Sequence, residues 1–413
     1  MSILNISAIL ISVATLLSYI NYRYIKLPST IGIMLISMLM SLFLIVTDNL
    51  GLFDLRDIAT DFLQQIDFNK TLMQGMLSFL LFAGALHINI NDLAQQKWVI
   101  ALLASAGLLL STTIIAFMSW YGFALLGFEL PFLYCLIFGA LISPTDPIAV
   151  LGILKSAHAP KTLETKIAGE SLFNDGVAVV VFIVILELIT GTQTLDASHI
   201  ALLFVEEAVG GVVFGLLAGW LTYFLLRQVD NYQLEVMLTL ALVMGGYALA
   251  NAIHVSGPIA VVVAGLLIGN KGRLLAMSDT TREHLDNFWE LIDEILNTVL
   301  FVLIGLELLV LQWGLGNIYA GLLAIPMVLL ARFISVALPI TLLRRQRPFS
   351  PHVIKILTWG GLRGGISVAL ALSLPAGPER DFILTVSYIV VVFSISVQGL
   401  SIGKLVQSTL TTK

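Results

Sequence analysis

Apolar runs fill this chain almost from end to end, and they set the solvent in which it must fold. Of its 413 residues, 58% are hydrophobic and 11% are charged, whereas a soluble domain carries about 25% charged residues. A run of about 20 apolar residues spans a bilayer, and lipid-exposed backbone of that length must be helical. The sequence therefore predicts an all-α membrane protein, a single transmembrane unit over residues 1–413. The predicted transmembrane helices, about 13 in number, are 3–22, 29–47, 71–88, 97–120, 131–154, 165–190, 199–227, 234–252, 257–270, 292–311, 316–343, 352–374 and 381–405.

The ends of the chain carry few signals of processing or extra domains. No Lys or Arg precedes the first apolar run, Ile3–Ile20, whereas a cleavable signal peptide has a basic start. We therefore expect a retained first helix. Apolar runs continue almost to Lys413, so we expect no soluble regulatory domain after them.

The distribution of Lys and Arg predicts the orientation in the membrane. With the N-terminus outside, 16 of these residues lie at inner loops or helix ends and 3 at outer ones. Cytoplasmic loops carry the excess of Lys and Arg in membrane proteins, so we predict an outer N-terminus and a cytoplasmic C-terminus. The predicted outer loop 48–70 is acidic instead. Segment 271–295 is the longest polar stretch on the inner side, and the sequence leaves open an amphipathic linker or a plain loop.

Two of the predicted spans are interrupted. Run 131–154 contains Ser143–Pro147, with two prolines, and run 352–374 contains Gly360–Gly365, with four glycines around Arg363. Both residue types disfavour a continuous helix. The runs are seven spans apart and cross in opposite directions, as inverted repeats do, and paired interruptions mark a transporter's midplane site.

The charges at these interruptions suit two crossed, broken helices. Helix N-termini carry partial positive charge and C-termini partial negative charge. If the two breaks cross, Asp146 offsets two N-terminal ends and Arg363 two C-terminal ends. A proline kink and close helix packing through glycine are the alternatives.

The segment Gly169–Gly176 places carboxylates in run 165–190. A charged group at mid-membrane costs on the order of 2.5–3.5 kcal/mol, so it is retained mainly for function. Ser171 and Asp175 share a helix face, as residues i and i+4 do. Asp175 with Ser171 offers hard oxygen ligands for a small cation, and a desolvated carboxylate also holds a proton. The alternative is a buried Asp in a structural pair.

Three further groups accompany this acid. Glu170 needs a partner in hydrocarbon, and Arg332 is the only arginine inside run 316–343, so we predict a structural ion pair between them. Asn174 either hydrogen-bonds backbone, fixes Asp175 or packs between helices. The acidic residues Glu290, Asp293 and Glu294 form either a funnel that attracts cations or favourable charges at a helix start.

Three motifs in matching order bring in a known family. Thr145–Asp146–Pro147, Glu170–Gly176 and Trp359–Gly364 resemble the monovalent cation–proton antiporters of the NhaP/NHE branch. The resemblance covers nearly the whole chain. It implies the NhaA/NhaP-like antiporter fold, with inverted repeats, and a homodimer.

The resemblance also implies a division of labour within each protomer. An ion-binding core domain would be built from spans 97–190 and 316–405. A dimerisation domain would be built from spans 1–96 and 199–311. The core would move like an elevator to give alternating access.

Site residues follow from the same resemblance. Asp175 would bind Na⁺ or a proton, helped by Ser171 and Thr145. Asn174 would be the Asn of an Asn-Asp pair, which implies electroneutral exchange, and Glu170 with Arg332 would be the family's structural ion pair. Some archaeal relatives add a carboxylate from the third span, but Leu80–Leu86 offers none here.

We therefore predict an electroneutral Na⁺/H⁺ antiporter for pH homeostasis in a prokaryotic plasma membrane. It would need membrane lipid but no cofactor and no nucleic acid, and it would not be an enzyme. A K⁺/H⁺ antiporter on the same scaffold is the nearest alternative, and Li⁺ is a further candidate cation. A channel and an intramembrane aspartyl protease using Asp146 and Asp175 are more distant ones. A metalloprotease is excluded because no His-Glu-x-x-His motif is present.

Overall fold

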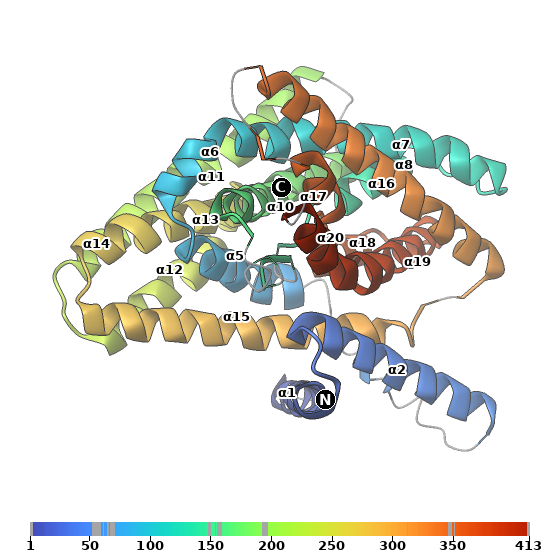
Figure 1. Ribbon diagram of the computed structural model, residues 1–413, viewed down its shortest axis with the longest axis horizontal. Helices are drawn as coiled ribbons and strands as arrows, with labels where there is room; N and C mark the ends of the chain where they lie inside the picture. Colours follow the sequence, from blue (N-terminus) through green and yellow to red (C-terminus); the bar gives the residue numbers. More distant parts are fainter. Residues whose placement is uncertain are drawn as a thin grey trace.

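The computed structural model is built from helices packed side by side (Figure 1). It describes residues 3–51, 59–60, 62–63, 66, 71–147, 150–152, 154, 159–191, 197–311, 313–345, 349–350 and 352–410, and no strand occurs among them. The helices, with π-helical segments written η, are α1 (Ile3–Ile20), η1 (Asn21–Ile25), α2 (Ser29–Asn49), η2 (Thr71–Met76), α5 (Leu77–Leu86), α6 (Ile90–Leu102), η3 (Leu103–Gly107), α7 (Leu108–Leu125), α8 (Phe132–Ile142), α10 (Lys161–Thr190), α11 (Ala197–Leu226), α12 (Tyr232–Ala252), α13 (Gly257–Leu267), η4 (Ile268–Gly272), α14 (Arg273–Leu275), α15 (Asp279–Glu307), α16 (Leu315–Leu343), α17 (Val353–Trp359), α18 (Gly365–Leu372), α19 (Pro378–Phe393), η5 (Ser394–Gly399) and α20 (Leu400–Leu410).

Many of these helices are suited to a bilayer. Among the described residues, the 8 helical stretches long and apolar enough to cross a membrane are Leu4–Ile25, Ser29–Asp48, Ile90–Leu125, Lys161–Thr190, Phe204–Leu226, Tyr232–Ala252, Leu315–Leu343 and Pro378–Thr409. Three more apolar helices are shorter, at Thr71–Leu86, Phe132–Ile142 and Gly257–Gly272. The prediction of an all-α, multi-pass membrane protein is therefore confirmed.

The polar segment in the middle of the chain is helical. Most of segment 271–295, for which an amphipathic linker and a plain loop were the alternatives, is the first half of α15, which runs unbroken to Glu307, so the plain loop is wrong. Ser278 caps this helix by accepting the Thr281 N–H (3.4 Å), and no proline follows before residue 307. Leu285 and Trp289 are buried within this polar half. The helix is therefore amphipathic, and its buried face holds it against the protein.

Most of the helices form two groups on the same side of α15. In Figure 1, α5, α6, α11, α12 and α13 lie on the left, and α7, α8, α16, α18 and α19 on the right. Contacts within each group agree with this layout, as in the pairs α11 with α13 and α16 with α19. Helix α15 runs below both groups, and α1 and α2 pack on its outer side. Small residues allow the closest approach, because a Cβ at Gly215 of α11 would lie 2.4 Å from the Ala260 carbonyl oxygen of α13.

Both predicted interruptions are present as breaks in the helices. Helix α8 ends at Ile142, before the two prolines, and residues 360–364 separate α17 from α18. The Asp146 N–H donates to the Leu362 carbonyl oxygen (2.8 Å), so the two breaks contact each other. Most of the predicted acidic loop 48–70, and residues 148–149, 153 and 155–158 after the first break, lie outside the described residues.

Candidate ion-binding site

A cavity of about 710 Å³ opens beside the first break. Residues from α5, α10, α15 and α18 line it, together with Thr145, Asp146 and Pro147 of the break. Three of its acidic residues are Asp146, Asp175 and Asp293, from three separate elements. Acidic residues outnumber the one lysine, Lys161, in the lining, so the cavity favours cations over anions.

Asp175 lies on α10 and is 6% exposed. Its carboxylate has no hydrogen-bond partner among the described residues, yet it lines the cavity. A buried carboxylate normally has a partner, since an unpaired buried charge is costly. An occupant from the cavity, either a cation or a proton, would supply the missing partner.

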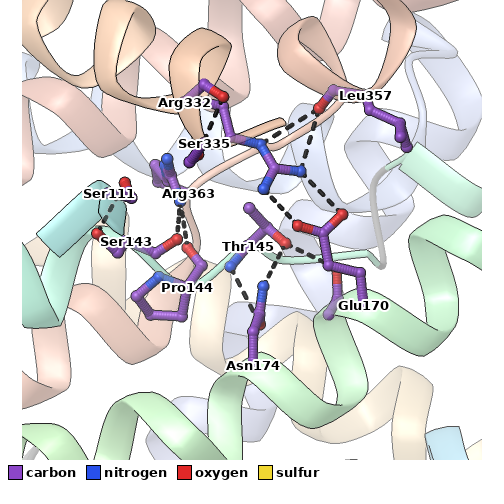
Figure 2. Close-up of polar contacts among 11 residues, drawn as sticks. Ser111, Ser143, Pro144, Thr145, Glu170, Asn174, Arg332, Ser335, Leu357 and Arg363 are labelled. Atoms are coloured by element: carbon purple, nitrogen blue, oxygen red, sulfur yellow. Dashed lines mark hydrogen bonds and ion pairs between the residues drawn. The ribbon is translucent and has the colours of Figure 1, made fainter. Parts of the chain in front are cut away.

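Thr145 is held by two residues of α10 (Figure 2). Its hydroxyl lies 2.9 Å from the Ser171 hydroxyl and accepts from Asn174 Nδ2 at 2.9 Å. Its N–H donates to Asn174 Oδ1 at 3.4 Å. Of these three residues, Thr145 lines the cavity, whereas Ser171 and Asn174 are engaged behind it. These bonds fix the unwound chain against α10, one helical turn from Asp175.

Arg363 and Asp146 each lie beside an end of a broken helix. Arg363 Nη1 donates to the Pro144 carbonyl oxygen at 2.8 Å and to that of Ser143, beyond the C-terminal end of α8 (Figure 2). The Asp146 carboxylate lies against Gly364, where a Cβ would be 2.1 Å from Oδ2, at the N-terminal end of α18. Each side chain thus lies beside a helix end of opposite partial charge. Only glycine at position 364 leaves room for this approach.

Glu170 and Arg332 form a buried ion pair between α10 and α16 (Figure 2). Arg332 Nη2 donates to Glu170 Oε2 at 3.0 Å, and Nη1 contacts Oε1, so the pair is joined at two points. Arg332 also donates through Nη2 to the Leu357 carbonyl oxygen at 3.1 Å. The pair therefore joins α10, α16 and α17, and the guanidinium leaves little of the carboxylate to bind another ion.

The sequence did not predict one polar contact, and it left the role of the acidic group on α15 open. Lys161 pairs with Asp92 at 2.8 Å on the wall of the cavity. These residues are far apart in the chain, so no spacing signalled the contact. Of the acidic group on α15, Glu290 and Asp293 line the cavity and Glu294 does not.

The described residues of the third span contribute no carboxylate to the cavity. Leu80, Leu81 and Gly84 of α5 line it, as does His87 directly after that helix. Within the part of the chain that the structure describes, no group of three His, Cys, Asp or Glu side chains is close enough to hold a metal ion.

Comparison with known proteins places this geometry in a family. The family described as "Sodium/hydrogen exchanger, transmembrane" matches residues 10–408. The Na⁺/H⁺ antiporter NhaP of Pseudomonas aeruginosa is 55% identical over 408 residues, covering 98% of this chain and 96% of that one. The Na⁺/H⁺ antiporter NhaH of Halobacillus dabanensis is 35% identical over 418 residues, covering 98% and 96%.

A solved structure agrees on the fold. The sodium proton antiporter MjNhaP1 from Methanocaldococcus jannaschii at pH 8 superposes with a TM-score of 0.76 at 20% identity, covering 98% of this chain and 97% of that one. The resemblance read from the three motifs is thereby confirmed. The chain belongs to the sodium/hydrogen exchanger family.

Proposed function

We propose that this protein is an electroneutral Na⁺/H⁺ antiporter in which one cation and one proton compete for Asp175. The observation that carries the proposal is the Asp175 carboxylate, which is buried and lines the cavity without a hydrogen-bond partner among the described residues. The related chains named as Na⁺/H⁺ antiporters support the choice of ions.

The coupling follows from a single shared site. With its proton lost, Asp175 binds Na⁺ together with Thr145, and Ser171 and Asn174 hold Thr145 in place. With its proton bound, the same carboxylate no longer attracts a cation. Because the site has the same net charge in both occupied forms, moving either form across the membrane is insensitive to voltage. Asn174, an uncharged amide beside Asp175, keeps that charge balance.

We propose that the chain is divided into a moving core and a dimerisation domain. We assign the core to spans 97–190 and 316–405 and the dimerisation domain to spans 1–96 and 199–311, in a homodimer of thirteen-helix protomers. Inverted repeats with crossed breaks would carry the site, and the contact of Asp146 with Leu362 supports the crossing. The core would move like an elevator to expose Asp175 to each side in turn.

The protein would sit in a prokaryotic plasma membrane with its N-terminus outside and its C-terminus in the cytoplasm. The Lys and Arg asymmetry supports that orientation, since positive charge marks cytoplasmic loops. Cysteine-scanning accessibility on intact cells would test it. Labelling of position 2 by an impermeant reagent, but not of position 404, is the expected result.

Transport in proteoliposomes tests the functional proposal. The purified protein is reconstituted, and cation-induced pH change is followed with Na⁺, Li⁺ and K⁺, with and without a clamped membrane potential. Na⁺-dependent proton movement that ignores the clamp, and that Asp175→Asn abolishes, is the expected result. Asp279→Asn removes an exposed carboxylate far from the cavity and is the matched control.

The other outcomes separate the alternatives. A response to K⁺ alone would replace Na⁺ with K⁺ on the same mechanism. Proton movement that changes when the membrane potential is clamped would overturn the proposal of electroneutral exchange. Proton movement with full activity in Asp175→Asn would overturn the role of Asp175.

A further inference from the structure

Two stretches near the C-terminal end of the sequence contain basic residues but no acidic ones. Between Glu307 and Glu379 there is no Asp or Glu, and there is none after Asp381. Arg344, Lys355 and Lys404 all lie in these acid-free stretches. No ion pair within the described residues neutralises any of the three. Within the described part of the chain, these three cations are therefore open to an external anion.

These three cations gather in one open groove. Its volume is about 880 Å³. Arg344 directly follows α16, Lys355 lies in the first turn of α17, and Lys404 lies in the middle of α20. His352 adds a further nitrogen at the same end, and no carboxylate lines the groove. Three like charges from three helices repel one another, so the arrangement favours an anion that bridges them.

The rest of the groove is apolar. Phe333, Ile354, Trp359 and Leu405 line it. Phe333 lies eleven residues before Arg344 on α16, which at 1.5 Å per residue places it about 16 Å from the cationic end. Half of a bilayer's hydrocarbon layer is about 15 Å thick. The groove therefore runs from a charged rim into the depth of one leaflet.

We propose that this groove binds an anionic glycerophospholipid, with its phosphate between Arg344, Lys355 and Lys404 and an acyl chain along α16 toward Phe333. Basic pockets between membrane helices are suited to such headgroups. A free phosphate would satisfy the charges but leave the apolar length uncovered. A zwitterionic lipid would cover the apolar length but bring its own cation to the rim.

The groove is separate from the cavity of Asp175, and no residue lines both. It lies instead against the helix that leads into the second break. Trp359 of α17 donates from Nε1 to Ser401 Oγ of α20 (2.8 Å), and its carbonyl oxygen accepts from Gln398 (3.0 Å). A lipid in the groove would thus brace α17 against α20. Binding at this site does not depend on which cation the protein transports.

Lipid-dependent stability of the purified full-length protein tests the proposal. Phosphatidylglycerol, phosphatidylcholine with the same acyl chains, and inorganic phosphate are titrated while the thermal midpoint is followed. Phosphatidylglycerol alone should raise the midpoint, because only this probe matches both ends of the groove. The triple variant Arg344→Gln, Lys355→Gln, Lys404→Gln should bind it on the order of 100-fold more weakly, at about fivefold for each cation lost.

Two controls keep the outcome specific. The triple variant Lys97→Gln, Arg227→Gln, Lys271→Gln removes as many exposed cations away from the groove and should respond as the wild type does. Lys355→Arg with Lys404→Arg keeps the charges and should retain binding. Equal stabilisation by phosphatidylcholine, or by phosphate alone, would overturn the proposal, and so would an unchanged response in the groove variant.

A second measurement places the lipid. Phosphatidylglycerol with brominated acyl chains quenches nearby tryptophans, and Trp359 is the tryptophan in the groove. The quenched fraction should fall in Trp359→Phe. It should also fall in the wild type when excess phosphatidylglycerol without bromine competes. Equal quenching with and without Trp359 would contradict binding in this groove.

Discussion

Two buried carboxylates on one helix, Glu170 and Asp175, have opposite surroundings. Glu170 is 1% exposed and is joined to Arg332 at two points. Asp175 is 6% exposed and has no hydrogen-bond partner among the described residues. They lie five residues apart on α10, so burial alone does not distinguish them. What differs is that only Asp175 faces the cavity.

The difference teaches what each carboxylate is free to do. A two-point ion pair with the guanidinium holds Glu170 in place and links α10 to α16 and α17. Asp175 keeps its ligand positions for an occupant from the cavity. The same chemical group, a carboxylate, thus stabilises the fold at one position and, in our proposal, exchanges ions at the next turn.

Asp175→Asn should have the largest effect on transport. The amide cannot take up and release a proton, so we expect exchange to fall at least about 100-fold, the scale for loss of an essential acid–base group. The thermal midpoint should stay close to that of the wild type, because no hydrogen bond is lost. Na⁺-driven proton movement measures the loss of exchange, and thermal unfolding measures the stability. A large loss of stability would mean that Asp175 is structural.

Glu170→Gln should reverse that pattern. It leaves Arg332 buried without a counter-charge, and breaking one partner of a buried pair costs about 3–5 kcal/mol. Stability should fall sharply, and Glu170→Gln with Arg332→Met should recover part of it. Asp92→Asn, which breaks the exposed pair with Lys161, should cost about 1 kcal/mol or less. A stable but inactive Glu170→Gln would erase the contrast between the two carboxylates.

Thr145→Val tests the second proposed Na⁺ ligand at nearly constant side-chain volume. It removes the hydroxyl that contacts Ser171 and Asn174, and an amide left unsatisfied costs about 1–3 kcal/mol. We expect weaker Na⁺ affinity with a smaller loss of maximal rate, measured as initial rates over a range of Na⁺. Thr145→Ser keeps the hydroxyl and should behave almost as the wild type. Equal losses in both variants would assign the effect to packing.

Asp293→Asn should have the smallest effect, because Asp293 acts on the cavity only through its charge. We expect about a two- to threefold rise in the KM for Na⁺ at low ionic strength, fading as salt screens the field. Glu294→Gln is the matched control, since Glu294 neighbours Asp293 on α15 but does not line the cavity. A salt-independent rise would indicate direct ligation instead.

Much of this arrangement was predictable because isolated charges in hydrocarbon have few possible partners. Arg332 is the only arginine in its span, so its contact with Glu170 followed from the sequence. Pro144, Pro147 and the glycines around Arg363 predicted the two breaks through their backbone chemistry. The family followed from the same residues. The roles of these residues in transport stay predictions.

The rest depended on contacts that leave no local signal. That α15 is one continuous helix was not predicted, because the charges of its first half interrupt the apolar pattern that marks a span, although Leu285 and Trp289 there are buried. The pair of Lys161 with Asp92 depends on how α10 packs against α6. Whether Ser171 faces the ion or Thr145 is a matter of side-chain direction, and the structure directs it to Thr145. Helix spacing defines a face but not the neighbour on it.

The pH dependence of Na⁺ affinity tests the central claim most directly. Initial rates of Na⁺ uptake are measured in proteoliposomes with equal pH on both sides, over a series of pH values. If Na⁺ and a proton compete for Asp175, the KM for Na⁺ rises as pH falls, approaching about tenfold per pH unit, while the maximal rate at saturating Na⁺ holds. A KM that does not change with pH would contradict the shared site.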